Sequence, residues 1–300
     1  MKIGIPLSKS AYTPESYAYY EYLNNRGWDV QLDYELDPDN DINIFFMGLR
    51  PFYKKYTGKA KVIHEYQSLS TAPFARLKDT VKRYINEQPD GRIFLSSSVS
   101  DVYRFNDKIP FIYRDMGISD IYFQTPSLNP IYDVVYCGSI ANRYGIEKVF
   151  LSIAAKGLKL AIIGDASNDF REKFITYKNV IFLGRKDKLE IAEVYRNSRF
   201  GLNYTPDIYP FNIQTSTKTL EYLASGLTLI SNKYYWVERF SNSIGNTPIW
   251  IDQLSNLDDN FLSHEFNGIE LIKEFNWSNT LNKSRFEDFL YKVVHNETNN

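Results

Sequence analysis

The sequence has 300 residues, which is long enough for two domains, and its hydrophobic content of 43% can supply a core to each. Its formal net charge of −1 excludes the global basic field that holds nucleic acid, so we expect no nucleic-acid partner. The single cysteine, Cys137, excludes a disulfide framework and zinc sites built from several thiolates. Three dispersed histidines leave little for a metal cluster, so no metal site is expected.

The first half of the chain alternates predicted strands and helices. It begins directly with a strand, and no apolar run reaches the length of about 18 residues that a membrane span needs, so we expect a soluble, cytoplasmic protein. Apolar runs predict strands at 3–7, 28–32, 42–47, 61–64, 92–95 and 109–113. Helices are predicted at 14–26, 73–85 and 97–105. This order is typical of βαβ units and indicates a Rossmann-like domain.

The predicted helix at 73–85 combines an apolar face with many cations. The apolar positions that share one face are Phe74, Leu77, Val81 and Tyr84. The basic residues on the remaining surface are Arg76, Lys78, Lys82 and Arg83. Such a helix packs on a core with its other side solvated, or lies on an anionic membrane surface. We favour the core-facing helix and leave peripheral contact with a membrane open.

One histidine stands where a sheet of this kind exposes ligand groups. His64 ends the strand at 61–64, beside Glu65, and open α/β sheets bind ligands at the carboxyl ends of their strands. An imidazole there can act as a base or as a sugar ligand on the acceptor side. A loop histidine that is bonded to the local backbone is the equally weighted alternative.

A second series of strands and helices follows residues 114–129, which lack periodicity and are expected to link two domains. Its predicted strands are 133–137, 158–163, 179–183, 199–204, 227–231 and 248–252. Its predicted helices are 144–156, 169–176, 188–198, 217–225, 261–275 and 279–294. We expect an acceptor-side domain at 1–128, joined by a C-terminal helix at 279–300, and a second domain at 129–278.

Small or polar residues follow several strands of the second half. They are Gly138-Ser139, Gly164-Asp165, Gly184-Arg185 and Tyr204-Thr205. Because the carboxyl ends of parallel strands share one edge of a sheet, we expect these residues to line one crevice.

The stretch 215–226 comes after the last of these strand ends. Ser216 or Thr217 is expected to cap a helix, and the free N–H groups of its first turn suit a phosphate. Lys218 adds a positive charge there, and Glu221, one turn further on, offers an acceptor for sugar hydroxyls. A phosphate seat beside a carboxylate is typical of a nucleotide site. An ordinary capped helix is the alternative, which the neighbouring strand ends disfavour.

Residues 133–240 resemble the nucleotide-sugar-binding domain of GT-B-fold retaining glycosyltransferases, especially bacterial enzymes that build surface polysaccharides. The strongest part is Lys218-Thr219-Leu220-Glu221-Tyr222-Leu223-Ala224-Ser225-Gly226, which is similar to the family's Lys-x-x-Glu-Tyr-x-Ala-x-Gly helix. Supporting parts are Gly138-Ser139 with Arg143 and Lys148, Ile163-Gly164-Asp165, and Asn179-Val180 with Leu183-Gly184. Their order and spacing make the resemblance specific.

The resemblance implies an α/β fold of two Rossmann-like domains with a cleft between them, the GT-B fold, whose C-terminal helix crosses back to the first domain. It also implies that Glu221 binds the ribose hydroxyls, that Lys218 holds the diphosphate, and that Arg143 neutralises its charge. The expected catalytic residues are Arg143, Lys218 and, from its own position in the chain, His64. The expected nucleotide-sugar-binding residues are Gly138, Ser139, Lys148, Gly164, Asp165, Gly184, Arg185, Asn212, Gln214, Ser216, Thr217 and Glu221.

One position departs from the family pattern. Many members carry two glutamates separated by seven residues, but the position before Glu221 is occupied by Ile213. Asn212 and Gln214 beside it are candidates for contact with the donor sugar, and Asp207 is another.

The expected function is transfer of a sugar from a nucleotide diphosphate sugar, UDP-linked, to a carbohydrate acceptor in the synthesis of surface glycans or glycoconjugates. The resemblance implies retention of configuration and no metal cofactor. Two alternatives stay open: a nucleotide-sugar-binding module without turnover, and a nucleotide-sugar epimerase of similar fold. The expected location is the cytoplasm, with the inner face of the cell membrane as a second option.

Overall fold

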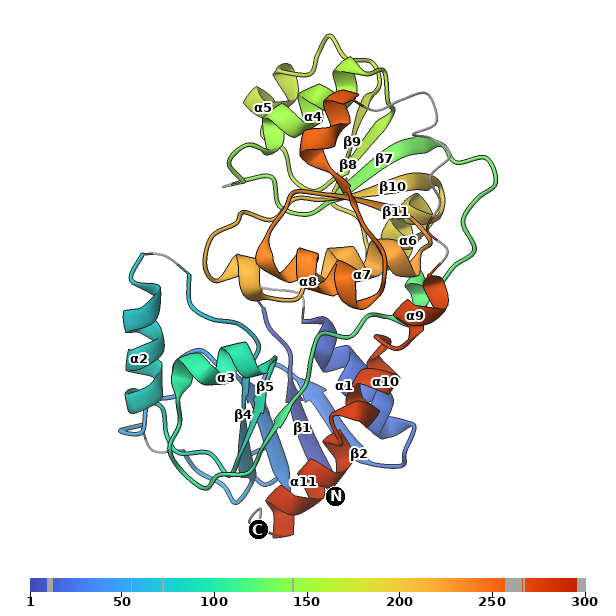
Figure 1. Ribbon diagram of the computed structural model, residues 1–300. Coiled ribbons are helices and arrows are strands. Elements are labelled where there is room, and N and C mark those ends of the chain that lie inside the picture. Colours follow the sequence, from blue (N-terminus) through green and yellow to red (C-terminus); the bar gives the residue numbers. More distant parts are fainter. Residues whose placement is uncertain are drawn as a thin grey trace. The chain divides into compact units, whose positions relative to one another are not determined.

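The computed structural model describes residues 1–9, 13–54, 56–71, 73–141, 143–256, 266 and 268–295. The chain divides into two compact units, Met1–Gly117 with Asn276–Asn300 and Ile118–Phe275. Each unit contains a parallel sheet with helices (Figure 1). The division after Gly117 comes before the expected boundary at 128, because Ile118 and Tyr122 are buried in the core of the second unit.

The first unit has six strands in the order β2-β1-β3-β4-β5-β6. Their bounds are β1 (Lys2–Pro6), β2 (Asp29–Asp33), β3 (Ile42–Phe46), β4 (Lys61–Tyr66), β5 (Gly91–Phe94) and β6 (Phe111–Tyr113). All neighbouring strands pair in parallel. Every strand that the apolar runs predict in this half of the chain is present, and the chain reverses its direction of winding between β1 and β3.

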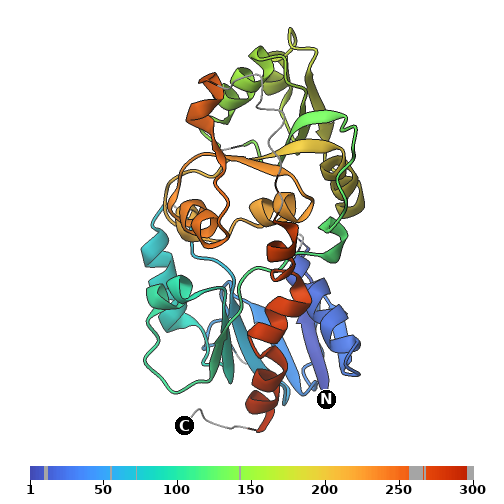
Figure 2. The same ribbon diagram turned by 45° about the vertical axis from the view of Figure 1, so that its right-hand side comes forward.

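The described helices of the first unit come from both ends of the chain. They are α1 (Pro14–Asn24), α2 (Ala75–Ile85), α3 (Ser97–Tyr103), α10 (Trp277–Lys283) and α11 (Phe286–His295). Isoleucines of the strands, such as Ile44 and Ile63, share one apolar core with side chains of α1, α10 and α11. Figure 2 shows α10 and α11, in red, lying across the strands. A Cβ at Gly91 would lie 2.7 Å from Val293, so α11 crosses β5 closely.

The C-terminal segment differs from the single helix expected at 279–300. It forms two helices, because Arg285 between them has a left-handed backbone conformation with φ of 54°. Residues 296–300 lie outside the described part of the chain. None of the described helices has the length and apolar content needed to cross a bilayer.

Helix α2 does not pack as expected. The core-facing interpretation is wrong, because Asp79 is the one residue of α2 that is buried. Asp79 accepts hydrogen bonds from the Ser70 backbone N–H (3.1 Å) and from the Tyr103 hydroxyl of α3 (3.3 Å). The apolar residues that were expected to face the core are exposed: Phe74, Leu77, Val81 and Tyr84. The helix is therefore attached to the unit through its polar side.

The second unit has six strands in the order β12-β11-β10-β7-β8-β9, again all parallel. They are β7 (Tyr132–Cys137), β8 (Leu160–Ile163), β9 (Val180–Gly184), β10 (Ser198–Asn203), β11 (Thr228–Ser231) and β12 (Ile249–Trp250). Its α-helices are α4 (Ile146–Ala155), α5 (Asn168–Glu172), α6 (Lys188–Arg196), α7 (Thr217–Ala224), α8 (Tyr235–Ser243) and α9 (Ile269–Lys273). Short 3-10 turns are η1 (Asp120–Tyr122), η2 (Phe211–Ile213) and η3 (Ile251–Asn256).

Three parts of the second unit differ from the sequence-based expectation. The segment 114–129 is more than a loose linker, since it contains η1 and contributes buried side chains to the core. Helix α8 was not expected at all. Of the helix expected at 261–275, residues 261–265 and 267 lie outside the described part, and α9 spans only Ile269–Lys273.

The strand order of the second sheet positions the candidate site. The sheet winds outward in both directions from β7 and β10, and open α/β sheets bind ligands outside the carboxyl ends of strands at such a reversal. Helix α7 lies close over these strands, since a Cβ at Gly201 in β10 would come within 2.2 Å of the Tyr222 ring. The Cys137 backbone N–H in β7 also donates a hydrogen bond to the Tyr222 hydroxyl (2.8 Å). The N-terminus of α7 is thereby fixed at this edge.

Candidate functional site

Helix α7 begins beside the carboxyl end of β10. The Ser216 hydroxyl accepts a hydrogen bond from the Thr219 N–H (3.3 Å) and donates one to Asn203 Oδ1 (3.1 Å), so Ser216 is the cap. Among the described residues, no acceptor meets the backbone N–H groups of Thr217 and Lys218. Two free donors and the positive end of the helix dipole therefore offer a seat for an anion.

Lys218 and Glu221 form an ion pair on the first turns of α7. Lys218 Nζ lies 2.6 Å from Glu221 Oε2, and the Tyr195 hydroxyl donates to the same oxygen at 3.0 Å. The Lys218 side chain is 35% exposed and that of Glu221 only 7%. Burial favours a lower pKa for Lys218, but the Glu221 carboxylate outweighs it and raises the pKa. The lysine is therefore a fixed cation, as a phosphate site requires.

The ion pair leaves one oxygen of the Glu221 carboxylate available to accept a hydrogen bond from a ligand. In the described part of the chain, no donor contacts Glu221 Oε1. The charge of Lys218 also acts on Cys137 at the end of β7, although burial still raises the pKa of that thiol. A buried thiol with a raised pKa is a packing group rather than a nucleophile. Lys218 and Glu221 thus present a cation and a hydrogen-bond acceptor side by side near the end of β7.

Arg143 is held across the two central strand ends. Its Nη1 donates to the Tyr204 carbonyl oxygen, just after β10, at 2.8 Å. The Tyr204 hydroxyl in turn donates to the Tyr144 carbonyl oxygen at 2.6 Å. Gly145, with φ of 90°, allows this contact, since a Cβ there would lie 2.4 Å from the Tyr204 hydroxyl. The loop after β7 and the end of β10 are therefore locked together, and Arg143 is positioned before any ligand binds.

Glycines bring three strand ends together along the same edge. The Gly138 N–H donates to Ile163 O (3.0 Å), and the Gly164 N–H donates to Gly184 O (2.9 Å). A Cβ at Gly164 would lie 2.2 Å from the Gly138 carbonyl oxygen, and the φ of 140° there also favours glycine. The expectation that these strand ends share one edge is confirmed.

Other predicted site residues follow these strands, and their side chains are exposed with few contacts to other described residues. Arg185 and Asp165 form an ion pair with each other (2.5 Å), and both are mostly exposed. Ser139 is exposed and donates to the Ala141 carbonyl oxygen (3.3 Å). Lys148 is exposed in the first turn of α4 and contacts no other described residue by a hydrogen bond or ion pair. Their roles stay predictions.

The loop before α7 contains buried polar atoms that lack partners among the described residues. They are Asn212 Oδ1 and Gln214 Nε2. The Asn212 amide is fixed, because its Nδ2 donates to Asp207 Oδ1 at 3.1 Å. A buried polar atom without a hydrogen bond is costly, so the two amide atoms are available to hydrogen-bond a ligand. The sequence had singled out both amides.

Two tyrosines support the site: Tyr195 was not predicted, and Tyr204 was named only as a residue at a strand end. Tyr195 of α6 is fully buried, and its hydroxyl donates a hydrogen bond to Glu221. Tyr204 orders the loop that carries Arg143. In a chain with 24 tyrosines, the only signal was that Tyr204 directly follows a strand, which does not separate it from other tyrosines.

His64 does not lie where the sequence placed it. The strand β4 continues to Tyr66, so His64 is inside the strand and has no exposed surface. Neither ring nitrogen has a hydrogen-bond partner among the described residues, and Nε2 lies 4.0 Å from Glu87 Oε1. Burial, with added repulsion from Arg50, lowers its pKa to about 3, so the ring is neutral at pH 7. The expected position at a strand end is wrong, and the structure gives His64 no access to an acceptor.

The next residue belongs to a buried charge cluster. Glu65 has no exposed surface and pairs with the equally buried Arg114. The Tyr19 hydroxyl donates to both carboxylate oxygens at 3.0 Å, and the Trp277 ring lies 5.2 Å from the guanidinium. Arg114 is therefore a core residue of the first unit rather than part of an exposed linker.

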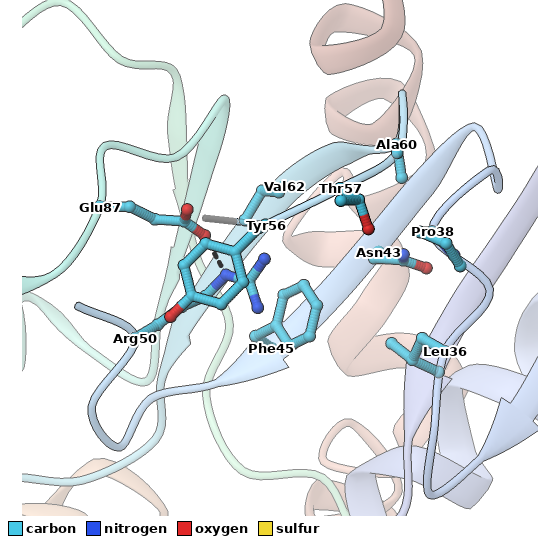
Figure 3. Close-up of a pocket in the computed structure, with 11 residues that line it drawn as sticks. Leu36, Pro38, Asn43, Phe45, Arg50, Tyr56, Thr57, Ala60, Val62 and Glu87 are labelled. Carbon is cyan, nitrogen blue, oxygen red and sulfur yellow. Dashed lines mark hydrogen bonds and ion pairs between the residues drawn. The ribbon is translucent and has the colours of Figure 1, made fainter. Parts of the chain in front are cut away.

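The first unit also contains a cavity of 510 Å³ on the face of its sheet (Figure 3). In it, the Arg50 guanidinium lies between the rings of Phe45 (4.0 Å) and Tyr56 (3.7 Å) and pairs with Glu87. The cavity exists because no helix covers this face among the described residues between β3 and β4. Its lining extends from Val62 at the start of β4 to Phe45 near the end of β3 and Arg50 beyond it, so the cavity spans the face of the sheet.

A scan against protein-family models and a search of the curated proteins find no match for this chain. Several solved structures are similar. AviGT4, a glycosyltransferase involved in avilamycin A biosynthesis, is 10% identical over 99% of both chains, with a TM-score of 0.64. Sucrose-phosphate synthase from Thermosynechococcus elongatus is 17% identical over 97% of this chain and 99% of its own, with a TM-score of 0.65. HepE from Anabaena, in complex with UDP and glucose, is 10% identical over 96% and 98%, with a TM-score of 0.62.

Similar structures are not confined to one activity. A candidate UDP-N-acetylglucosamine 2-epimerase from Listeria monocytogenes is 10% identical over 99% of this chain and 97% of its own, with a TM-score of 0.60. At such low identity the likeness shows the fold alone. The chain therefore has the GT-B fold, with two Rossmann-like units, which confirms the fold class that the sequence predicts.

Proposed function

We propose that this protein is a glycosyltransferase that moves a sugar from a UDP-linked donor to a carbohydrate acceptor in glycan or glycoconjugate synthesis, with retention of configuration. The observation that carries the proposal is the edge of the second sheet. There the start of α7, the Lys218–Glu221 pair and Arg143 meet the ends of β7 and β10. The likeness to solved glycosyltransferases along the whole chain supports it.

The proposed donor fits the order of groups along this edge. A nucleoside diphosphate needs an acceptor for its ribose hydroxyls next to positive charge for its phosphates. Glu221 Oε1 offers the acceptor, while Lys218 and the free N–H groups of α7 offer the charge. The unpaired amide atoms of Asn212 and Gln214 lie in the loop before α7, where the family pattern has its first glutamate, and we assign them to the donor sugar.

In the proposed reaction, the bond between the anomeric carbon and the diphosphate oxygen breaks, a bond to the acceptor hydroxyl oxygen forms, and the hydroxyl proton passes to the departing diphosphate. Negative charge then grows on that oxygen, and the sugar gains oxocarbenium-like character. Lys218 and Arg143 stabilise the growing charge. Both are fixed in advance, Lys218 by Glu221 and Arg143 by the Tyr204 carbonyl, so little reorganisation is needed during the reaction.

We propose that no metal cofactor is required, because these two cations and the helix N-terminus can supply the positive charge that a divalent ion supplies in other transferases. The described residues contain no group of three or more His, Cys, Asp or Glu side chains arranged to hold a metal ion. We also keep the expected cytoplasmic location. The buried free thiol of Cys137 suits a reducing compartment.

A nucleotide-sugar epimerase is the second candidate, and the similar structure from Listeria monocytogenes is the observation in its favour. It would use the same seat for the nucleotide but would need no acceptor. A binding module without turnover is the third, motivated by Ile213 at the position of the first glutamate.

A titration followed by a turnover assay tests the proposal. Calorimetry with UDP, and with ADP and GDP as base controls, should show binding of UDP that Glu221→Gln weakens. Incubation with UDP-sugars and saccharide acceptors should then release UDP and form a glycoside. Isomerised donor without acceptor would assign an epimerase, and binding without release would assign a module. Absence of UDP binding by the folded protein would refute the nucleotide site itself.

A further inference from the structure

The apolar side of α2 faces solvent. Residues three and four apart share a helix face, so Leu77, Val81 and Tyr84 form one stripe, opposite the buried Asp79. Leu77 is 60% exposed and Tyr84 is 68% exposed. Phe74, which precedes the helix, is 76% exposed. Figures 1 and 2 show α2 at the margin of the first unit beside α3, and the exposures of these side chains show that none of the described residues covers the stripe.

A neighbouring loop extends the stripe. The Phe52 N–H donates to the Ile85 carbonyl oxygen (2.9 Å), and Pro51 bridges to Asn86, so the loop 49–53 is joined to the end of α2. Three large apolar side chains of this loop are more than half exposed, namely Leu49, Phe52 and Tyr53. The α2 stripe and the exposed side chains of this adjoining loop are here called the α2 surface.

Positive charge surrounds the α2 surface. Arg76 and Lys78 lie on the two sides of Leu77 and are exposed, and Lys82 and Arg83 follow on the next turn. The one acidic residue of the helix, Asp79, is buried and hydrogen-bonded on the opposite side. In a chain with a net charge of −1, this concentration of cations is local.

We propose that the α2 surface docks the protein onto an anionic lipid bilayer. An exposed helix with an apolar stripe, aromatic residues and flanking Lys and Arg is the pattern that lies in the plane of a membrane interface. The stripe would enter the boundary between headgroups and acyl chains. Arg76 and Lys78 would contact anionic headgroups, and tyrosines such as Tyr84 favour the interfacial region.

A bilayer explains the α2 surface better than a protein partner. The buried centre of protein–protein interfaces is depleted in lysine, whereas here cations border the apolar stripe on both sides. A membrane also needs no shape complementarity, which suits a single helix with a short loop. Self-association of two copies through the stripe would bring their cations together, which is unfavourable.

Vesicle binding tests the proposal without reference to catalysis. The purified protein should co-sediment with vesicles of phosphatidylcholine and phosphatidylglycerol more strongly than with phosphatidylcholine alone, and salt should weaken the binding. Arg76→Gln and Lys78→Gln should each reduce binding about fivefold. Leu77→Gln with Tyr84→Gln should abolish it. The matched controls are Leu189→Gln and Lys188→Gln in α6, which change equally exposed residues of the second unit and should have no effect.

A fluorescent label reports insertion directly. Cys137 is buried, so Leu77→Cys would provide the accessible thiol for an environment-sensitive dye. Anionic vesicles should shift its emission to the blue, while a label on Leu189→Cys should not respond. Equal binding to neutral vesicles, retention of binding by the Leu77/Tyr84 variant, or an unshifted label would overturn the proposal. A change of oligomeric state in that variant, measured by sedimentation, would assign the α2 surface to a second copy instead.

Discussion

Lys218→Met is expected to lower both the stability of the protein and its affinity for UDP, but to very different extents. The substitution keeps the apolar stem and removes the ammonium group. Breaking a fully buried ion pair costs about 3–5 kcal/mol. Lys218 is 35% exposed, and Tyr195 still holds Glu221. Because solvent screens such a pair, we expect the free energy of unfolding to fall by only about 1–2 kcal/mol.

The loss of binding free energy for UDP should be larger than the loss of folding stability. The change removes a cation from the phosphate seat and leaves the Glu221 carboxylate uncompensated beside the incoming phosphates. We therefore expect affinity for UDP to fall about 100-fold, which corresponds to about 2.7 kcal/mol. Adding Glu221→Gln removes the uncompensated charge. The double variant should regain its stability but only part of its affinity, because neither the cation nor the carboxylate acceptor returns.

Calorimetry with UDP and urea unfolding measure the two effects separately. Lys273→Met is the matched control, since Lys273 pairs with Glu270 at the same distance of 2.6 Å and the same spacing on α9, but is exposed. It should change neither quantity. If Lys218→Met binds UDP as tightly as the wild type, or if the control loses affinity equally, the phosphate seat is not at α7.

Two predictions concern buried groups of the first unit. His64 is neutral in the folded protein with a pKa of about 3, whereas the unfolded chain binds its proton below about pH 6.5, so stability is lost as the pH falls through this range. At pH 4.5 the loss is about 2.7 kcal/mol relative to pH 7. Urea unfolding should show that His64→Leu removes this part of the pH dependence. Arg114→Met should cost about 3–5 kcal/mol by leaving Glu65 buried without its cation, and Arg114→Met with Glu65→Gln should recover much of it in the same assay. An additive double variant would contradict the pairing.

The strands and the alignment of their ends could be predicted because both depend on local sequence. Apolar runs locate a buried parallel strand, and parallel pairing then places all carboxyl ends at one edge. The glycines at 138, 164 and 184 marked that edge in advance. The Ser216 cap followed in the same way from a polar residue before an apolar periodicity.

The wrong predictions share a physical cause. A local sequence pattern does not show which distant part of the chain packs against it. The polar pair His64-Glu65 ended the strand in the sequence-based prediction, although β4 continues through both residues. Alternation of side chains sends His64 to one face of the sheet and Glu65 to the other, and each is buried by elements far away in the chain. Glu65 is tolerated only because Arg114 and Tyr19 meet it there.

The prediction that the apolar face of α2 packs on the core is wrong for the same reason. Its periodicity correctly identifies an apolar face, but periodicity cannot say whether that face meets a core or a solvent boundary. The deciding contact is made by Asp79 with Ser70 and Tyr103, and nothing in the spacing of the helix reveals it. The sequence therefore located the helix and its stripe, while the direction in which the stripe points needed the structure.

The Lys218–Glu221 pair also bears on the kind of anion that the site would accept. A half-buried lysine without a carboxylate would have a lowered pKa, so Glu221 keeps the cation charged. For inorganic phosphate alone, however, a buried carboxylate at the seat is a liability, because it repels the ligand. Its presence is favourable only when the ligand also carries hydroxyl donors next to its phosphates. A nucleoside diphosphate has that combination in its ribose, and Glu221 Oε1 is the acceptor that the described residues leave unoccupied.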